Sequence, residues 1–243
     1  MSDDALSTDA TSDDSFVEED APPGRGEHRW PMALAALSAA VLHELLPGDF
    51  QLGNAWVYPI LMGAFLILLI AGDPGLIDRE RRWLRITTGG MIALIAVANL
   101  FSAIRLVDGI ITDACYSENS IQLLEIGGIV WATNVIAFAL WYWDVDGGGS
   151  VKRAIHGAWH DPAFVFPEMN MPERVGASWY PHFADYLAFA FATATAFSPT
   201  DVSAIKRWAK MLMVLQSMTS LVLATLVLSK AINGLGGTAP ICP

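Results

Sequence analysis

Residues 211–231, MLMVLQSMTSLVLATLVLSKA, contain a single charged side chain, Lys230. A helix of about 20 mainly apolar residues is long enough to cross the hydrocarbon core of a bilayer. This stretch therefore predicts a transmembrane helix near the carboxyl end. Four earlier stretches, residues 30–47, 55–72, 86–104 and 121–143, have the same character or nearly so. We expect an all-α, polytopic helix bundle in which residues 30–143 hold four transmembrane helices.

Composition supports a membrane protein. The 243 residues are 53% hydrophobic and only 16% charged, with a mean hydropathy of +0.42, whereas soluble domains carry about 25% charged residues. The 14 basic residues against 25 acidic ones give no basic surface for nucleic acid. Two cysteines are too few for a disulfide scaffold or a cysteine-rich zinc site.

The acidity belongs to the amino-terminal tail, residues 1–28, which carries nine carboxylates and one base, Arg25. It has almost no large apolar side chains, which predicts disorder, because such a segment cannot bury enough surface to offset its ordering entropy. It lacks the apolar core of a signal peptide, so we expect it to stay on the mature protein. The tail is either a solvated leader or a tether for a basic partner.

Arginines in the short joints set the expected orientation. Residues 73–85 contain four arginines and are expected in the cytoplasm. Residues 48–54 have no base and 105–120 have only Arg105, so both joints are expected outside. The polar connector, residues 144–181, is likewise expected in the cytoplasm. These assignments predict a multi-pass protein of the plasma (inner) membrane with a cytoplasmic amino terminus.

The topology of the last part, residues 182–236, depends on residues 183–197, FADYLAFAFATATAF. A helix of this length covers about 22 Å, short of the roughly 30 Å core. The chain therefore has either six spans, or five spans and a re-entrant half-helix; the second choice keeps Lys206, Arg207 and Lys210 in the cytoplasm. Ala188, Ala192 and Ala196 predict a smooth packing face, and Asp185 suits the start of the helix.

The next four residues, Ser198-Pro199-Thr200-Asp201, form a turn with the features of a helix start. Ser198 suits the N-cap, Pro199 the first helical position and Asp201 the third position of a capping box. This pattern predicts a helix that opens here and continues through Trp208 into residues 211–231.

The carboxyl half, with FVFPEMNMP at 164–172 and ASWYPHFADYLAFAFATATAFSPTD at 177–201, resembles an uncharacterised family of bacterial integral membrane proteins. That family pairs a Phe-Pro connector with an aromatic stretch, a polar turn ending in Asp and a last apolar helix. Its members have no established activity, so the resemblance implies membrane topology and no particular reaction.

The same region also resembles, more distantly, the two-helix pore modules of potassium channels. Aligning Asp201 with the aspartate that ends the potassium filter places residues 196–200 where its T-V-G-Y-G would stand, and neither glycine is present. Such a filter needs tightly packed carbonyls, which Pro199 does not supply. The resemblance therefore implies a pore-loop-like scaffold that is not selective for potassium.

Polar side chains in membrane helices are candidates for function, with interhelical hydrogen bonding as the simpler interpretation. Asn99 and Asn134 lie inside the third and fourth predicted helices. The candidate pore or polar lining consists of Thr193, Thr195, Ser198, Thr200, Asp201, Gln216, Thr219 and Ser220. Arg105 and Glu125 are expected to form an ion pair at the outer helix ends.

Catalytic and metal-binding patterns are not evident. His156 and His160 are four residues apart but have no third ligand close by in sequence. The glycines at 147–149 predict a flexible joint. We therefore expect no catalytic residues, metal or cofactor. The leading hypothesis is a homo-oligomeric, channel-like or passive transport scaffold. The alternative is a structural or partner-binding membrane protein that uses its acidic tail.

Overall fold

The computed structural model describes residues 26–54, 56–72, 82–112, 120–195 and 201–236, and the chain there is mostly helical. The longer helices are α1 (Trp30–Glu44), α2 (Val57–Gly72), α3 (Arg82–Thr112), α4 (Ser120–Val145), α7 (Phe183–Thr195) and α8 (Arg207–Gly236). The short elements are η1 (Gly48–Phe50), η3 (Asp146–Gly148), α5 (Ser150–His156), β1 (Phe164–Val165), η4 (Pro167–Asn170), α6 (Pro172–Val175) and β2 (Ser203–Ala204).

Three helices, α3, α4 and α8, are long and apolar enough to cross a membrane. Helix α2 is apolar but has 16 residues, and α1 has 15 and ends at Glu44 rather than at the predicted residue 47. At 1.5 Å per residue these two reach only about 22–24 Å. The prediction of a helical chain that contains helices of membrane-spanning length is confirmed.

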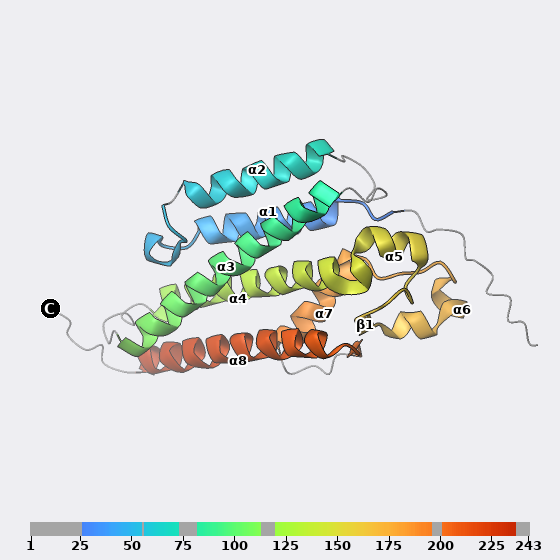
Figure 1. The fold of residues 1–243 in the computed structure, drawn as a ribbon. Helices are drawn as coiled ribbons and strands as arrows, with labels where there is room; N and C mark the ends of the chain where they lie inside the picture. The colour runs from blue at the N-terminus through green and yellow to red at the C-terminus, as the bar shows by residue number, and fades with distance from the viewer. Residues whose placement is uncertain (1–25, 55, 73–81, 113–119, 196–200, 237–243) are drawn as a thin grey trace, which may run out of the picture.

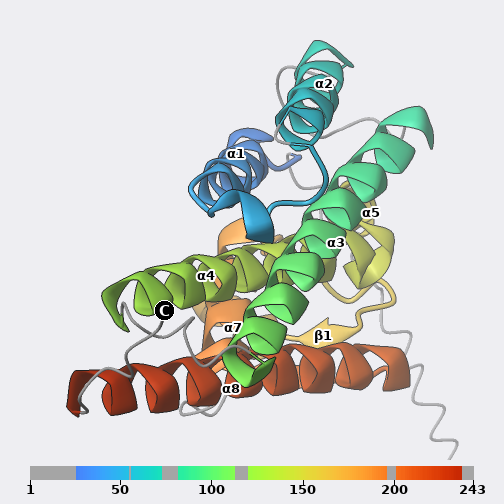
Figure 2. The ribbon, with the colours of Figure 1, turned by 90° about the vertical axis from the view of Figure 1, so that its left-hand side faces the viewer.

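Helix α4 is the centre of the bundle and contacts α1, α3, α7 and α8. Figures 1 and 2 show α8 along one side of α4, and α1 with α2 away from α8. The short α7 lies between α4 and α8 at the end of the bundle that carries α5, α6 and β1. Gly127 allows α8 a close approach to α4, because a Cβ there would lie 2.7 Å from Val227 Cγ1.

The residues after α4 pack onto the bundle. Phe164 and Phe166, at relative exposures of 0% and 3%, belong to the main hydrophobic core. Strand β1 pairs antiparallel with β2, in the register Phe164↔Ala204 and Val165↔Ser203. Part of the polar connector predicted at 144–181 is therefore integral to the core.

An ion pair on the surface strengthens this pairing of β1 and β2. Lys206 Nζ donates to Asp161 Oδ2 at 2.7 Å. The hydrogen bond and charge of Lys206 lower the pKa of the Asp161 carboxyl below its usual value. The pair therefore stabilises the fold above the ordinary carboxyl pKa, and that contribution disappears as the pH falls through the lowered value.

The start of α7 and the strand that follows it, β2, lie at the same end of the bundle. At the start of α7, the Tyr186 hydroxyl donates to Asp146, in the turn that follows α4. After it, β2 pairs with β1, and Ile205 N donates to Ala163 O at 2.9 Å. Asp185 Oδ2 accepts from His182 N at 2.8 Å, which confirms the predicted role of Asp185 at the helix start.

The turn at Asp201 does not open the last helix, which corrects the capping prediction. Asp201 is exposed in a bend, residues 203–204 are extended in β2, and α8 begins only at Arg207. The backbone groups of residues 203–204 pair with β1, and a helix at this position would lose that pairing. Ser198 and Thr200 lie outside the described residues.

The alanine face predicted for residues 183–197 is also wrong in its register. Ala188 is exposed and Ala192 half-buried, whereas Ala190 and Ala194 face the core together with Tyr186 and other residues. Ala196 lies outside the described residues. Large aromatic side chains gain more from burial than alanine does. They therefore determine which side of α7 packs inward.

The glycines at 147–149 form a defined turn instead of a flexible joint. Gly147 adopts φ +56°, and a Cβ there would lie 2.8 Å from Arg153 Cγ and 3.2 Å from His160 O. Only glycine reaches such backbone angles at low cost. The turn brings Arg153 back against the end of α4.

Gly147→Ala is therefore expected to lower the free energy of unfolding by about 2–4 kcal/mol, from left-handed backbone strain and overpacking. Gly53→Ala is the control, because φ is also positive there, at +73°, and nothing lies within 4 Å of the added Cβ. That variant should lose only the strain, about 1–2 kcal/mol. Unfolding in detergent micelles, followed by circular dichroism, measures both; equal losses would contradict the close contact with Arg153.

Candidate functional site: buried polar groups around α4

Polar side chains occupy one side of α4 and the start of the η3 turn that follows it, at intervals of four or eight residues. Asn134, Tyr142 and Asp146 are each 0–1% exposed. Residues four apart lie on the same face of a helix. These three side chains therefore form a buried polar line along the central helix, directed at its neighbours.

At the middle of the bundle, Asn134 links three helices. Asn99 Nδ2 on α3 donates to Asn134 Oδ1 at 3.2 Å, and Asn134 Nδ2 donates to Ser220 Oγ on α8 at 2.9 Å. Both asparagines and Ser220 are buried, at 5%, 1% and 0% exposure. Asn99 and Asn134, taken from the sequence as intramembrane polar candidates, are thus brought together as one hydrogen-bonded chain.

One helical turn toward the connector, Gln216 makes a second link. Gln216 Oε1 accepts from the Tyr142 hydroxyl at 2.7 Å, and Gln216 Nε2 donates to Ala190 O of α7 at 2.8 Å. Gln216 is fully buried. It therefore joins α8 to α4 and to the short helix α7 at once.

The threonines of the predicted lining bond to their own helices. Thr193 Oγ1 donates to Phe189 O, Thr195 Oγ1 to Ala192 O and Thr219 Oγ1 to Leu215 O, each at 2.9 Å. Such bonds satisfy a hydroxyl inside an apolar helix without a partner helix. Among the described members of the lining proposed from the sequence, Gln216 and Ser220 are the residues whose side chains bind across helices.

The predicted ion pair between Arg105 and Glu125 does not form. Arg105 Nε donates instead to the backbone oxygen of Asp49 at 3.2 Å. The η1 turn packs against the end of α3 and offers that carbonyl to the guanidinium. Arg105 thus fixes the turn between α1 and α2.

A cluster of buried charges at the connector end of the bundle escaped sequence reasoning. Asp146 and Arg153 are each 1% exposed, and Glu27 is 5% exposed. Asp146 Oδ1 accepts from Ala163 N at 2.6 Å, and Asp146 Oδ2 accepts from the Tyr186 hydroxyl. The carboxylate thereby holds both the connector and α7.

Arg153 faces the same cluster. Its NH1 atom donates to the backbone oxygens of Trp143 and Asp146, and its guanidinium carbon lies 5.0 Å from the centre of the Tyr186 ring. Nε and NH2 of Arg153 have no hydrogen-bond partner among the described residues. The guanidinium therefore closes the end of α4, where carbonyls lack helical partners.

Glu27 shows that the predicted tail, residues 1–28, ends too late in the sequence. Its Oε1 accepts from Phe183 N at 2.6 Å and its Oε2 from Trp143 Nε1 at 2.8 Å. A carboxylate at the first residue of α7 also complements the helix dipole. Residues 1–25 lie outside the described part of the chain, so the disorder and the partner predicted for them stay predictions.

No group of three or more His, Cys, Asp or Glu side chains suited to a metal ion occurs within the described ranges. The rings of His156 and His160 stack with centroids 4.3 Å apart, and His156 Nδ1 lies 3.1 Å from Lys152 O.

Gln216 is expected to matter for stability far more than its neighbour Thr219. In Gln216→Leu the buried Tyr142 hydroxyl loses its acceptor, at a cost of about 1–3 kcal/mol. Thr219→Val, the control on the same helix, should stay within about 0.5 kcal/mol because that hydroxyl bonds only locally. Adding Tyr142→Phe to Gln216→Leu should recover part of the loss in detergent unfolding; a purely additive double variant would contradict the link.

Comparisons with protein-family models, with curated proteins and with solved structures find no significant match. The resemblances noted from the sequence stay predictions. Function is therefore inferred from the geometry of the chain itself.

Proposed function

We propose that this is an integral membrane protein in which α4, α7 and α8 form a channel-like scaffold for passive transport that is not selective for potassium. The supporting observation is the path of α7, which starts beside Asp146 and is followed by β2 at the same end of the bundle. In this proposal α7 is a re-entrant half-helix. The amino terminus, the connector and β2 face the cytoplasm of the plasma membrane.

Burial of α7 makes a re-entrant position physically acceptable. Backbone that is not part of a membrane-spanning helix is tolerated at membrane depth only when protein or water covers it. Helix α7 has 13 residues, or about 20 Å. It packs on α4, α8 and α1, and Glu27 caps the backbone nitrogen of Phe183.

A conduit within one described chain has little support, because the interhelical polar groups there bond to one another. The Asn134, Tyr142 and Gln216 side chains are committed to partners on neighbouring helices. We therefore place the conduit between copies in a homo-oligomer, along α8. Only 22% of the apolar window of α8 is buried within one chain, and an apolar constriction can gate a pore by dewetting.

Solute flux into proteoliposomes tests this proposal. Vesicles with the purified oligomer should pass at least one of potassium, sodium, chloride and glycerol faster than empty vesicles, with no preference for potassium over sodium. Met218→Trp, at a site 62% exposed on α8, should reduce that flux. The matched control Ile111→Trp, at a site 71% exposed on α3, should leave it unchanged.

Flux indistinguishable from empty vesicles for every solute, from protein that melts cooperatively, would reject the transport proposal. The structural or partner-binding alternative with the acidic tail would then be preferred. That alternative predicts that removing residues 1–25 abolishes binding to a basic partner while unfolding is unchanged.

A further inference from the structure

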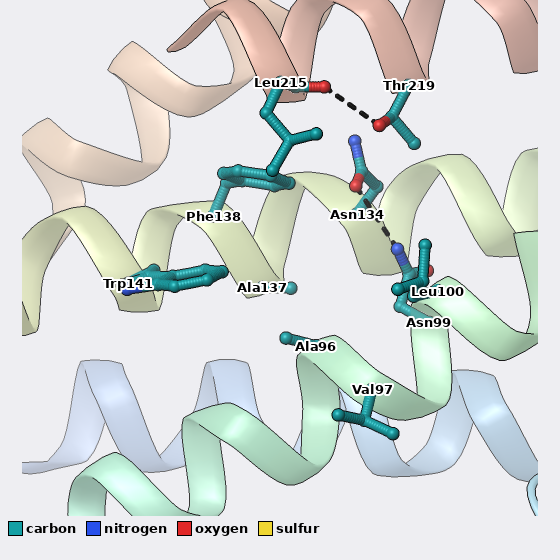
Figure 3. A pocket seen from close by; sticks show the side chains of 10 residues that line it. All are labelled: Ala96, Val97, Asn99, Leu100, Asn134, Ala137, Phe138, Trp141, Leu215 and Thr219. Atoms are coloured by element: carbon teal, nitrogen blue, oxygen red, sulfur yellow. Dashed lines mark hydrogen bonds between the residues drawn. The ribbon is translucent and has the colours of Figure 1, made fainter. Parts of the chain in front are cut away.

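A pocket of about 250 Å³ lies between α3, α4 and α8, at the middle of the three longest helices. Figure 3 shows the Asn99 and Asn134 amides at one end of the pocket and the Trp141 ring at the other. Phe138, Ala96 and Leu215 line the space between them. Its wall is thus apolar except at the amide end.

The pocket opens sideways. Val97 and Leu100 of α3 and Leu215 of α8 line it and are each 52–55% exposed. These are apolar residues on two of the helices long enough to span a membrane. In a bilayer such a mouth faces hydrocarbon, so ligands reach it from the membrane and not from water.

The amide end of the pocket holds a buried acceptor that has no donor. Asn99 is 5% exposed, one N–H of its Nδ2 is committed to Asn134, and its Oδ1 has no hydrogen-bond partner among the described residues. The Thr219 hydroxyl donates to Leu215 O, so it too presents lone pairs. A buried acceptor without a donor is unusual in folded proteins and calls for an explanation.

We propose that this pocket binds a membrane-dissolved apolar alcohol, whose hydroxyl donates to Asn99 Oδ1 and whose hydrocarbon body fills the space toward Trp141. An engineered apolar cavity of 150 Å³ accepts benzene, so by proportion this pocket holds a molecule of about ten carbon atoms. Because Asn99 Oδ1 is the polar atom at this end that lacks a partner, and an ether cannot donate to it, the site selects a hydroxyl donor over an ether of the same skeleton. The inference does not depend on transport by α7 and α8.

Photolabelling of the full-length protein in detergent micelles tests the proposal. The probe is an octanol that carries a diazirine on its chain, and labelled peptides are identified by mass spectrometry. Saturable label is expected on the α3, α4 and α8 peptides that contain Val97, Trp141 and Leu215. Competition by 1-octanol should be about fivefold stronger than by octyl methyl ether, after correction for partition into the micelles, as expected for one hydrogen bond.

Variants separate recognition of the hydroxyl from filling of the pocket. Asn99→Leu should reduce the preference for octanol over the ether from about fivefold to less than twofold. Thr87→Val is the matched control on α3, because that hydroxyl bonds only to Trp83 O; its preference should stay about fivefold. Leu215→Trp narrows the mouth and should reduce labelling.

Equal competition by octanol and the ether in the native protein would overturn the proposal, because the hydroxyl would then go unrecognised. Absence of saturable label from the three peptides would also overturn it and favour a lipid chain or a second copy of the protein as the occupant. If Asn99→Leu fails to fold, the comparison in the native protein and the Leu215→Trp variant still decide.

Discussion

Asp146→Ala is expected to lower the free energy of unfolding by about 3–5 kcal/mol, because it leaves buried hydrogen-bond donors without an acceptor. Asp146 and Arg153 are each 1% exposed. The carboxylate accepts hydrogen bonds from Ala163 N, Phe164 N and the Tyr186 hydroxyl. Its loss leaves these three donors without an acceptor.

Two variants make this result interpretable. Asp161→Ala removes a carboxylate from a solvent-exposed pair and should cost far less, because water screens such a pair. Asp146→Asn keeps the shape and an acceptor oxygen, so its loss should fall between the two. Titration with sodium dodecyl sulfate in mixed micelles, followed by tryptophan fluorescence, gives the values. A loss for Asp146→Ala no larger than for Asp161→Ala would show that the cluster does not hold the connector to α4.

The second large effect is expected at Glu27. Glu27→Ala leaves Phe183 N and Trp143 Nε1 buried without an acceptor, and each unmet donor costs about 1–3 kcal/mol, for a total of about 2–6 kcal/mol. The start of α7 should then exchange its amide hydrogens faster than the middle of α4. Hydrogen exchange with mass spectrometry measures this difference directly.

Glu173→Ala is the control for Glu27→Ala, because Glu173 is an exposed acidic residue of α6. It should change neither stability nor exchange. Unchanged exchange at residues 183–187 in Glu27→Ala would mean that Glu27 does not anchor α7.

The sequence predicted the helices whose signal is length and apolarity. Residues 86–104, 121–143 and 211–231 all lie within observed helices, α3, α4 and α8. Their ends were missed because polar side chains continue a helix beyond the apolar run: α3 extends through Arg105 and Asp108 to Thr112. The two-residue strands are too short to show a periodicity in the sequence. The predicted start of α8 is therefore wrong, because β2 precedes the helix.

The buried charge cluster could not be found by spacing. Glu27, Asp146 and Tyr186 are separated by at least 40 residues, and only the folded chain brings them to one place. In the sequence Glu27 is one acid among nine in the tail. A usable signal was present at Gly147, because three consecutive glycines after a carboxylate also suit a tight turn with positive φ.

Impermeant maleimide labelling of single cysteines in intact cells tests the re-entrant path of α7 most directly. The sites are Ser178→Cys in the connector, Asp201→Cys after α7 and, as the external control, Asp49→Cys in η1, each with Cys115 and Cys242 replaced by serine. The account predicts label at Asp49→Cys only, with Ser178→Cys and Asp201→Cys reacting after lysis. Label at Asp201→Cys in intact cells, with Ser178→Cys protected, would show that α7 crosses the membrane and would contradict the account.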